Sequence, residues 1–402
     1  MIPQDNKKVN PVRKSDFSNG VKILLTGGGT GGSVSPLLAV ADELESQKSI
    51  KSKVQRDYEF LWVGTEKGLE KEMVEKAGIK FVAMPSGKLR RYFSINNFID
   101  PFRIIAGFFK SLFIISRFKP DLIMTAGAFV SVPVVWAGWC LRVPILVHQQ
   151  DVRPGLANKL MAPFAKAITV TFEESLADYG KRAVWTGNAV QFSIFNFKFS
   201  IKEVYKKFGL NKDLPIVLIV GGGTGAEGIN KLVWGNLDKL AEICQIIHIS
   251  GKGKIPNYKL PITNYQSFEF LEHEKVMEIM QAADLVVSRA GLGFLTEISS
   301  LAKPAIIIPL PNTHQEDNAR VFEEKKGAII LDQKKLTPEV FSSKIKDLLN
   351  NKNLREELGD NAGKIMKKGA NEEMVRIVER LAHNTSCHCE EESRDDEAIS
   401  RT

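Results

Sequence analysis

Cysteine is scarce in this sequence, with four residues in 402: Cys140, Cys244, Cys387 and Cys389. Four cysteines are too few for a disulfide framework, which favours a reducing compartment. Residues 1–20 are polar throughout and lack the apolar core of a secretion signal, so we expect no export. The 44 % of apolar and 25 % of charged residues exclude a chain disordered as a whole, a collagen-like chain and a polytopic membrane protein.

Short apolar runs alternate with stretches of helical periodicity along the chain. Such alternation is typical of parallel sheets that are covered on both faces. The order of strand, glycine loop and helix restarts at residue 216, so we predict an α/β fold of two doubly wound Rossmann-like domains that face a ligand cleft. The predicted strands are Val21–Thr26, Phe60–Val63, Leu122–Thr125, Ile145–Val147, Ala167–Val170, Ile216–Val220, Ile246–Ser250, Leu285–Ser288 and Ala305–Pro309.

We expect the first domain to span residues 20–186 and the second to span 187–383. Residues 1–19 are expected to form a flexible extension. Residues 384–402 carry six acids against two bases and several serines, so we expect a disordered tail. The run Cys387–Cys389 in this tail lacks the further ligands and the rigid frame of a metal site, and we predict no metal.

Two glycine-rich loops, Gly27–Ser33 and Gly221–Ala226, lack the residues of the common nucleotide-binding loops. A loop of the ATP-binding type needs a lysine after its last glycine, and Ser33 stands there instead. A dinucleotide site needs an acid at the end of the second strand, and Glu66 lies too far along. Both loops still let backbone N–H groups approach an anion, although a plain tight turn would have the same composition.

Two further polar segments follow predicted strands. In Ser288–Glu297, two glycines open a turn and a helix follows, so Glu297 falls near a ligand at the positive end of that helix; the alternative is a surface Glu stabilised by the helix dipole. The loop Pro309–Ala319 is rich in groups that hydrogen-bond sugar hydroxyls, although a plain solvated loop would look similar.

Basic residues concentrate between positions 85 and 119, where seven bases accompany one acid in a chain of net charge +8. A localised basic stretch implies an anionic partner: nucleic acid, phosphate or a membrane surface. The same stretch is rich in Phe and Ile, but Asp100, Arg103 and Lys110 interrupt the apolar run, so it is a poor bilayer span. We predict that part of it is a buried helix and that the remainder lies on anionic headgroups.

The order and spacing of seven segments resemble the MurG family. Its members are UDP-N-acetylglucosamine transferases that act on undecaprenyl-pyrophosphoryl-N-acetylmuramyl-pentapeptide, called lipid I. The resemblance covers about residues 21–382. The matching segments are Gly27–Ser33, Gly127–Pro133, His148–Asp151, Gly187–Val190, Gly221–Ala226, Ser288–Glu297 and His314–Asn318.

This resemblance implies a two-domain glycosyltransferase B fold with an acceptor- and membrane-facing first domain and a UDP-sugar-binding second domain. It implies an inverting transfer of N-acetylglucosamine from UDP-N-acetylglucosamine to lipid I, giving lipid II in peptidoglycan synthesis, without a metal or other cofactor. The lack of an Asp-x-Asp motif at a strand end agrees with the last point. The implied partners are the UDP-sugar, the undecaprenyl-linked acceptor and an anionic membrane surface, not nucleic acid. The implied location is the cytoplasmic face of the cell membrane, as a peripheral protein.

Carried over by position, the family's binding residues fall on both predicted domains. Asp151 stands where the family contacts N-acetylglucosamine, Leu271 would lie along the uracil, and Gln315 would contact sugar hydroxyls. Glu297 would bind the ribose hydroxyls. The first-domain positions that face the sugar and the acceptor phosphates are Thr30, Gly31 and Gly32. The remaining donor positions are Gln191, Gly223, Leu292, Gly293, Phe294, Leu295 and Thr296.

Several of these positions depart from the family pattern. Ser33 replaces a His, Gln149 a Glu and Asp151 an Asn; Gln191 stands in place of an Arg and Gly223 in place of a Ser. A hydroxyl alone cannot act as a general base near neutral pH, but a carboxylate can. Our hypothesis is that Asp151 takes the acceptor proton and Ser33 positions the acceptor or its phosphate. The alternative is that Asp151 only hydrogen-bonds the donor sugar.

Two other functions stay open at this point. One is a different enzyme of the same fold, such as a UDP-N-acetylglucosamine 2-epimerase or a glycolipid glycosyltransferase. The other is a non-catalytic, membrane-associated nucleotide-sugar-binding protein, which the missing His and Glu would permit. The basic and apolar segment favours a lipid acceptor over epimerisation.

Overall fold

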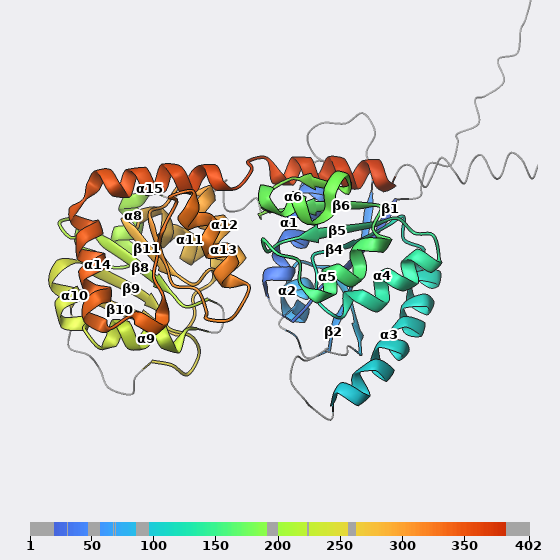
Figure 1. The fold of residues 1–402 in the computed structure, drawn as a ribbon, viewed down its shortest axis with the longest axis horizontal. Helices are drawn as coiled ribbons and strands as arrows, with labels where there is room; N and C mark the ends of the chain where they lie inside the picture. Colours follow the sequence, from blue (N-terminus) through green and yellow to red (C-terminus); the bar gives the residue numbers. More distant parts are fainter. Residues whose placement is uncertain are drawn as a thin grey trace, which may run out of the picture.

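A computed structural model describes residues 20–29, 31–46, 57–66, 68, 70–85, 96–190, 200–222, 225–255 and 263–382. The extension 1–19 and the tail 384–402 therefore lie outside the described residues. Two parallel sheets form two domains that lie side by side (Figure 1). The prediction of two doubly wound domains is confirmed.

The N-terminal domain is built on a seven-stranded sheet of order β3-β2-β1-β4-β5-β6-β7. Its strands are β1 (Val21–Thr26), β2 (Tyr58–Thr65), β3 (Lys80–Met84), β4 (Leu122–Thr125), β5 (Ile145–Gln149), β6 (Ala167–Val170) and β7 (Ala183–Trp185). Its main helices are α1 (Ser35–Ser46), α2 (Glu70–Lys76), α3 (Asn96–Phe118), α4 (Ser131–Cys140), α5 (Leu156–Met161) and α6 (Leu176–Tyr179), with the 3-10 turn η1 (Gly31–Ser33) before α1.

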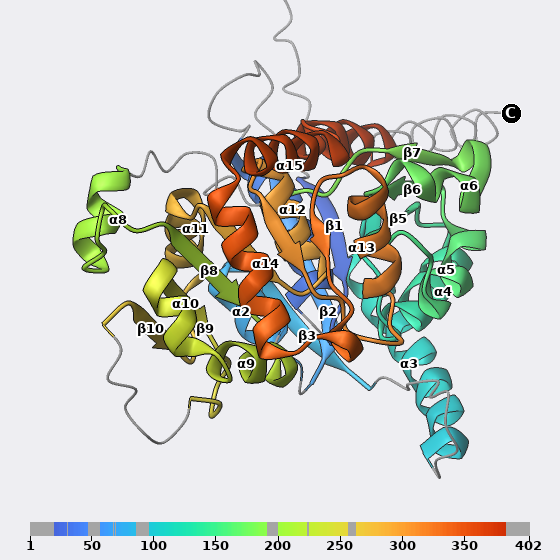
Figure 2. The same ribbon diagram turned by 60° about the vertical axis from the view of Figure 1, so that its left-hand side comes forward.

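Alternate residues of β1 enter two different cores, as expected for a strand buried on both faces. Ile23 and Leu25 pack with α1, whereas Leu24 packs with residues of α3, α4 and α5 on the other face. In both views α3 lies at the lower edge of this domain, and one of its ends projects from the molecule (Figures 1 and 2).

The C-terminal domain is built on a six-stranded sheet of order β10-β9-β8-β11-β12-β13. Its strands are β8 (Ile216–Val220), β9 (Gln245–Ile249), β10 (Tyr265–Phe268), β11 (Leu285–Ser288), β12 (Ala305–Ile307) and β13 (Ile329–Ile330). Its helices are α8 (Ile201–Lys207), α9 (Glu227–Trp234), α10 (Leu237–Ile243), α11 (His273–Ala282), α12 (Leu292–Ser300), α13 (Gln315–Glu324), α14 (Pro338–Asn350) and α15 (Lys352–Ile365).

Both glycine loops lie where the strand order of their sheet reverses. β1 lies between β2 and β4, and β8 lies between β9 and β11. At such a switch point the connections leave to opposite sides and open a crevice at the carboxyl ends of the strands. The topology therefore brings the two loops to the edges of the sheets where ligands bind in folds of this kind.

The last described helix, residues 370–382, crosses back to the N-terminal domain (Figure 1). Met374, Val375 and Val378 are buried in the same core as Leu37 and Leu38 of α1. The predicted second domain, residues 187–383, includes this segment, because the sequence of an amphipathic helix does not reveal which domain covers its apolar face.

The two domains also share buried contacts away from this helix. Val152 and Phe172 of the N-terminal domain are buried in the core of the C-terminal domain. Lys325, which follows α13, places its Nζ 2.7 Å from a carboxylate oxygen of Glu174. The two domains are thus joined by apolar and ionic contacts.

Candidate functional site

The buried side chain of Glu70, the first residue of α2, holds the first glycine loop through hydrogen bonds. Glu70 Oε2 accepts a hydrogen bond from the Gly29 N–H at 3.2 Å, and Oε1 accepts one from the Thr65 N–H at 2.9 Å and another from the Thr65 hydroxyl. A Cβ at Gly28 would lie 2.4 Å from Glu70 Oε1. A side chain at position 28 would therefore displace the Glu70 carboxyl group from these hydrogen bonds.

Removing the Glu70 carboxyl group should destabilise the N-terminal domain. Hydrogen bonds to a carboxylate contribute roughly 1.5–3 kcal/mol each. We therefore expect Glu70→Ala to lower the free energy of unfolding by about 2–4 kcal/mol, because Gly29 and Thr65 lose their acceptor. Urea unfolding checks this, with Glu75→Ala on the exposed face of the same helix as the control. Equal stability of the two variants would show that Glu70 does not hold the loop.

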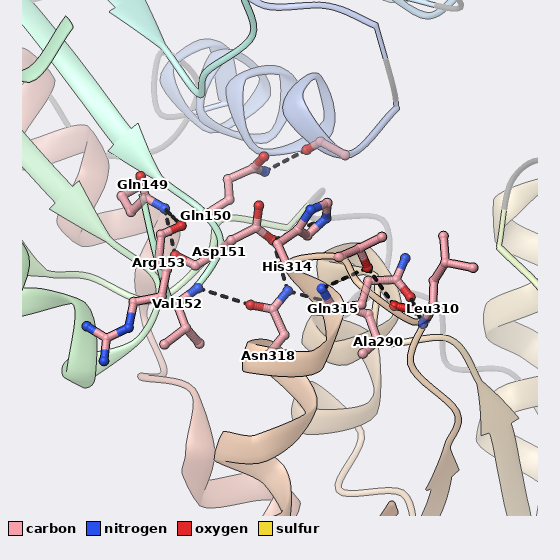
Figure 3. Close-up of polar contacts among 12 residues, drawn as sticks. Gln149, Gln150, Asp151, Val152, Arg153, Ala290, Leu310, His314, Gln315 and Asn318 are labelled. Carbon is pink, nitrogen blue, oxygen red and sulfur yellow. Dashed lines mark hydrogen bonds and ion pairs between the residues drawn. The ribbon is translucent and has the colours of Figure 1, made fainter. Parts of the chain in front are cut away.

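Ser33, at the end of η1, is buried with its hydroxyl directed into the same loop. Its Oγ donates a hydrogen bond to the Gly28 carbonyl at 3.2 Å. Gly31 and the exposed Gly32 form the rest of η1, and the Gly32 carbonyl accepts a hydrogen bond from Gln150 Nε2 at 2.6 Å (Figure 3). Gln150 thus ties the loop after β5 to the first glycine loop.

Gln149, where the family has an acid, shapes the loop that carries Asp151. It is buried at the end of β5, and its Nε2 donates to the Asp151 carbonyl at 2.7 Å and to the Arg153 carbonyl at 3.1 Å (Figure 3). Its Oε1 accepts from Asn158 Nδ2 at 2.5 Å and from the Tyr179 hydroxyl at 2.9 Å. These four bonds fold the loop 149–153, a role that sequence reasoning missed.

Asp151 lies at the boundary between the domains, with its side chain partly exposed. Its Oδ1 accepts a hydrogen bond from Asn318 Nδ2 at 2.9 Å, and His314 Nε2 lies 3.9 Å away (Figure 3). Asn318, a fully buried residue of α13, also accepts the Val152 N–H at 3.0 Å. None of these contacts uses Asp151 Oδ2. One carboxylate oxygen is therefore engaged with the second domain.

A buried polar chain runs from β5 to α12. His148 Nε2 lies 3.1 Å from Asn188 Oδ1, and Nδ1 lies 3.0 Å from Thr169 Oγ1. The Asn188 amide in turn donates to Thr296 Oγ1 at 2.9 Å. Burial lowers the pKa of His148 to about 4, although its bond to Asn188 opposes the shift. His148 is therefore neutral near pH 7, with its proton on Nε2 toward the Asn188 oxygen.

The N-terminus of α12 is open to a ligand. Gly291 occupies the N-cap position, and no side chain caps the first turn. Leu292 and Leu295 are buried in the domain core, whereas Gly293 is exposed and a Cβ there would meet nothing within 4 Å. Uncapped N–H groups at a helix N-terminus are suited to an anion.

Glu297, the sixth residue of α12, is buried, and its two carboxylate oxygens differ in their hydrogen bonding. Oε1 accepts a hydrogen bond from His273 Nε2 at 2.7 Å. Oε2 is buried and has no hydrogen-bond partner within the described residues. Leu271, two residues before His273, packs against the core of the same domain. Sequence reasoning missed His273 because no motif links it to Glu297.

The structure brings together part of the predicted site. Asp151 and the first glycine loop meet through the loop 149–153, and Asp151 meets α13 through Asn318. Gln315, the first residue of α13, accepts the Leu310 N–H with Oε1 at 3.0 Å, so it helps to order its own loop (Figure 3). Partly buried Phe294 and buried Thr296 complete the α12 segment. Thr30, Gln191 and Gly223 lie outside the described residues, and the described part holds no group of three or more His, Cys, Asp or Glu placed to bind a metal.

Family models match both domains. The glycosyltransferase family 28 N-terminal domain matches residues 23–170, and the glycosyltransferase family 28 C-terminal domain matches residues 216–375. Among solved structures, the Acinetobacter baumannii MurG crystal structure has a TM-score of 0.68 at 23 % identity and covers 90 % of this chain and 99 % of that one. A Neisseria meningitidis UDP-GlcNAc 2-epimerase has a TM-score of 0.65 at 14 % identity over 90 % of this chain and all of that one. At these identities both show the fold alone.

Two relatives with greater sequence similarity carry the same name. A Clostridium kluyveri protein is 38 % identical over 332 residues, which are 81 % of this chain and 91 % of the relative. A Clostridium tetani protein is 36 % identical over 337 residues, 82 % of this chain and 90 % of the relative. Both are named UDP-N-acetylglucosamine–N-acetylmuramyl-(pentapeptide) pyrophosphoryl-undecaprenol N-acetylglucosamine transferase. The chain therefore belongs to this family of transferases, the MurG family, with the two domains of glycosyltransferase family 28.

Proposed function

We infer that this protein transfers N-acetylglucosamine from UDP-N-acetylglucosamine to lipid I in peptidoglycan synthesis. The observation that carries the inference is its 36–38 % identity to transferases of that name over nine-tenths of their length. The epimerase alternative has only fold-level likeness at 14 % identity in its favour. The protein is a hexosyltransferase, and the non-catalytic alternative is set aside on the same ground.

We assign donor binding to the second domain. The uncapped N–H groups at the start of α12 support this assignment, because they would stabilise the diphosphate, whose charge grows as UDP leaves. The unpartnered Oε2 of Glu297 supports a contact with the ribose hydroxyls, because a buried carboxylate oxygen needs a donor. Leu271 would lie along the uracil, and Gln315 would contact the transferred sugar.

We propose that Asp151 is the general base that accepts the hydroxyl proton of the acceptor sugar. The 4-hydroxyl oxygen of the muramyl sugar attacks the anomeric carbon, the bond from that carbon to the UDP oxygen breaks, and the hydroxyl proton passes to the Asp151 carboxylate. Attack opposite the leaving group inverts the anomeric centre. Backbone N–H groups of α12 supply stabilisation of the leaving UDP without a metal. Ser33 positions the acceptor by shaping the loop through its bond to Gly28.

The outer face of α3 supports binding to a membrane surface. Phe102, Ile105, Phe109 and Phe113 follow one another at helical spacing and are 73, 54, 64 and 66 % exposed. Gly107, Ser111 and Ile115 on the other face are buried. None of the helices in the described part of the chain is both long and apolar enough to cross a bilayer. We propose that this stripe inserts among headgroups and brings the first domain to the lipid-linked acceptor.

The test of the reaction is UDP release from UDP-N-acetylglucosamine with and without a lipid I analogue. We expect release only with the analogue, and we expect Glu297→Ala to raise the KM for the donor about tenfold or more, because hydrogen bonds to a charged group contribute roughly 1.5–3 kcal/mol. Glu357→Ala, an exposed Glu of α15, is the matched control. Release without the analogue would indicate hydrolysis, and no release with it would indicate an epimerase or a binding protein.

A further inference from the structure

His273 lies beside the donor segment but belongs to none of the predicted site positions. It is the first residue of α11, and its Nε2 lies 2.7 Å from Glu297 Oε1 on α12. The His273 side chain is 46 % exposed, whereas that of Glu297 is 9 % exposed. The imidazole thus reaches from the solvent edge of the site to a carboxylate that is almost enclosed.

The pairing leaves the carboxylate half satisfied. Glu297 Oε2 is buried without a hydrogen-bond partner in the described structure. Such orphaned oxygens are rare and point to a missing donor. By holding Oε1, His273 fixes the orientation of the carboxylate and leaves Oε2 as the oxygen that still lacks a donor.

We propose that His273 is a positioning residue of the donor site, which holds and neutralises Glu297 so that this carboxylate can bind a hydroxyl of an anionic nucleoside diphosphate sugar. The proposal rests on the proposed function, which places the donor at α12. Its physical basis is charge: a diphosphate carries negative charge, and an uncompensated carboxylate in the same site would repel it. Protonated His273 supplies the compensating charge.

The surroundings of His273 favour its protonated form. Burial lowers its pKa, but the hydrogen bond and charge of Glu297, and then the charge of Glu274 on its own helix, outweigh burial and raise the pKa above its ordinary value. Among the described residues, these two carboxylates are the ionisable groups that act on the imidazole. A raised pKa means that the charged pair is complete below the ordinary pKa of histidine and is lost as the pH rises through the raised value.

The experiment is donor binding by calorimetry between about pH 6 and pH 9, where histidines titrate. We expect the affinity of the parent protein for UDP-N-acetylglucosamine to fall as the pH rises through the pKa of His273. His273→Gln keeps a hydrogen-bond donor but loses the charge. It should weaken binding about three- to tenfold at the lower pH and show little further change with pH, because charge-assisted hydrogen bonds are roughly twice as strong as neutral ones.

Two further variants separate this role from a structural one. Lys275→Gln removes one positive charge from the same helix, where Lys275 pairs with Glu272 at 3.4 Å, and should leave affinity and pH profile unchanged. In a Glu297→Gln background, His273→Gln should have no additional effect, because the histidine acts through that carboxylate. Thermal unfolding of each variant checks that the domain remains folded.

The outcomes distinguish this proposal from the function on which it rests. If Glu297→Gln weakens donor binding and His273→Gln does not, the positioning role is wrong and the proposed function stands. If His273→Gln weakens binding equally at all pH values and in the Glu297→Gln background, its effect is structural and the proposal is overturned. Failure of the parent protein to bind the UDP-sugar would overturn both.

Discussion

Asp151→Asn is expected to lower kcat by about 10²–10⁴-fold, the usual contribution of a general base. The donor dissociation constant should change little. Asn retains an oxygen that can accept the hydrogen bond from Asn318 Nδ2, now 2.9 Å from Asp151 Oδ1, but it cannot take a proton from the acceptor hydroxyl. The measurements are single-turnover UDP release with saturating lipid I analogue and calorimetry with the donor.

Asp178→Asn is the matched control for this change. Asp178 lies in the same domain, 3.3 Å from Arg153 of the Asp151 loop, and has no contact with the second domain among those described. Its substitution should leave kcat unchanged. If Asp151→Asn turns over at close to the parent rate, Asp151 is not the base. If Ser33→Ala abolishes turnover with donor affinity preserved, the roles of the two residues are reversed.

A loss of kcat in Asp151→Asn could also arise from the lost contact between the domains. The variant Asn318→Ala distinguishes this explanation from the loss of a general base. This variant removes the hydrogen bonds that Asn318 makes to Asp151 and to the Val152 N–H but keeps the carboxylate. Proton transfer as the main role predicts a much smaller loss of kcat in Asn318→Ala than in Asp151→Asn. Equal losses would assign the effect to domain contact rather than to base catalysis.

The strands that sequence reasoning found and missed differ in burial. β1, β4, β8 and β11 lie inside their sheets, and the sequence predicted each of them with the bounds that the structure has. The four missed strands, β3, β7, β10 and β13, are the four edge strands of the two sheets. Most of their residues are only partly buried. A strand covered on fewer sides needs fewer apolar residues, so its run is too weak to recognise.

The site followed from the sequence only where it depends on local order. The order of strand, glycine loop and helix predicts a switch point, and β1 and β8, which precede the two loops, lie where the strand order reverses. The hydrogen bonds that hold the site residues in place join residues that are far apart in the sequence. These pairs are Gly29 with Glu70, His273 with Glu297, and Asp151 with Asn318. No local pattern relates such partners, because only the folded sheets bring them together. Gln149 shows that a matching position does not give the role. The family has an acid at this position, but the hydrogen bonds of Gln149 to the Asp151 carbonyl and from Asn158 order the loop instead.

Removing the exposed apolar stripe of α3 should abolish most binding to anionic vesicles. Full burial of a Phe or Ile side chain contributes roughly 1.5–3 kcal/mol. If insertion buries about half of each of the four side chains, changing Phe102, Ile105, Phe109 and Phe113 together to Ser should lower the partition coefficient by about 10²–10⁴-fold. Folding should persist, because Gly107, Ser111 and Ile115 on the opposite face keep their buried contacts.

The basic residues of α3 should strengthen membrane binding independently of the apolar stripe, since each base near an anionic surface adds about 1 kcal/mol. Arg103→Gln with Arg117→Gln should therefore weaken binding to vesicles with anionic lipid and leave binding to neutral vesicles unchanged, and added salt should have a similar effect. Ile201→Ser with Val340→Ser removes exposed apolar residues from the second domain and serves as the control. Sedimentation with vesicles measures all three variants. If the stripe variant partitions like the parent protein, or if binding ignores both anionic lipid and salt, α3 is not the membrane-binding surface, and the acceptor must reach the first domain by another face.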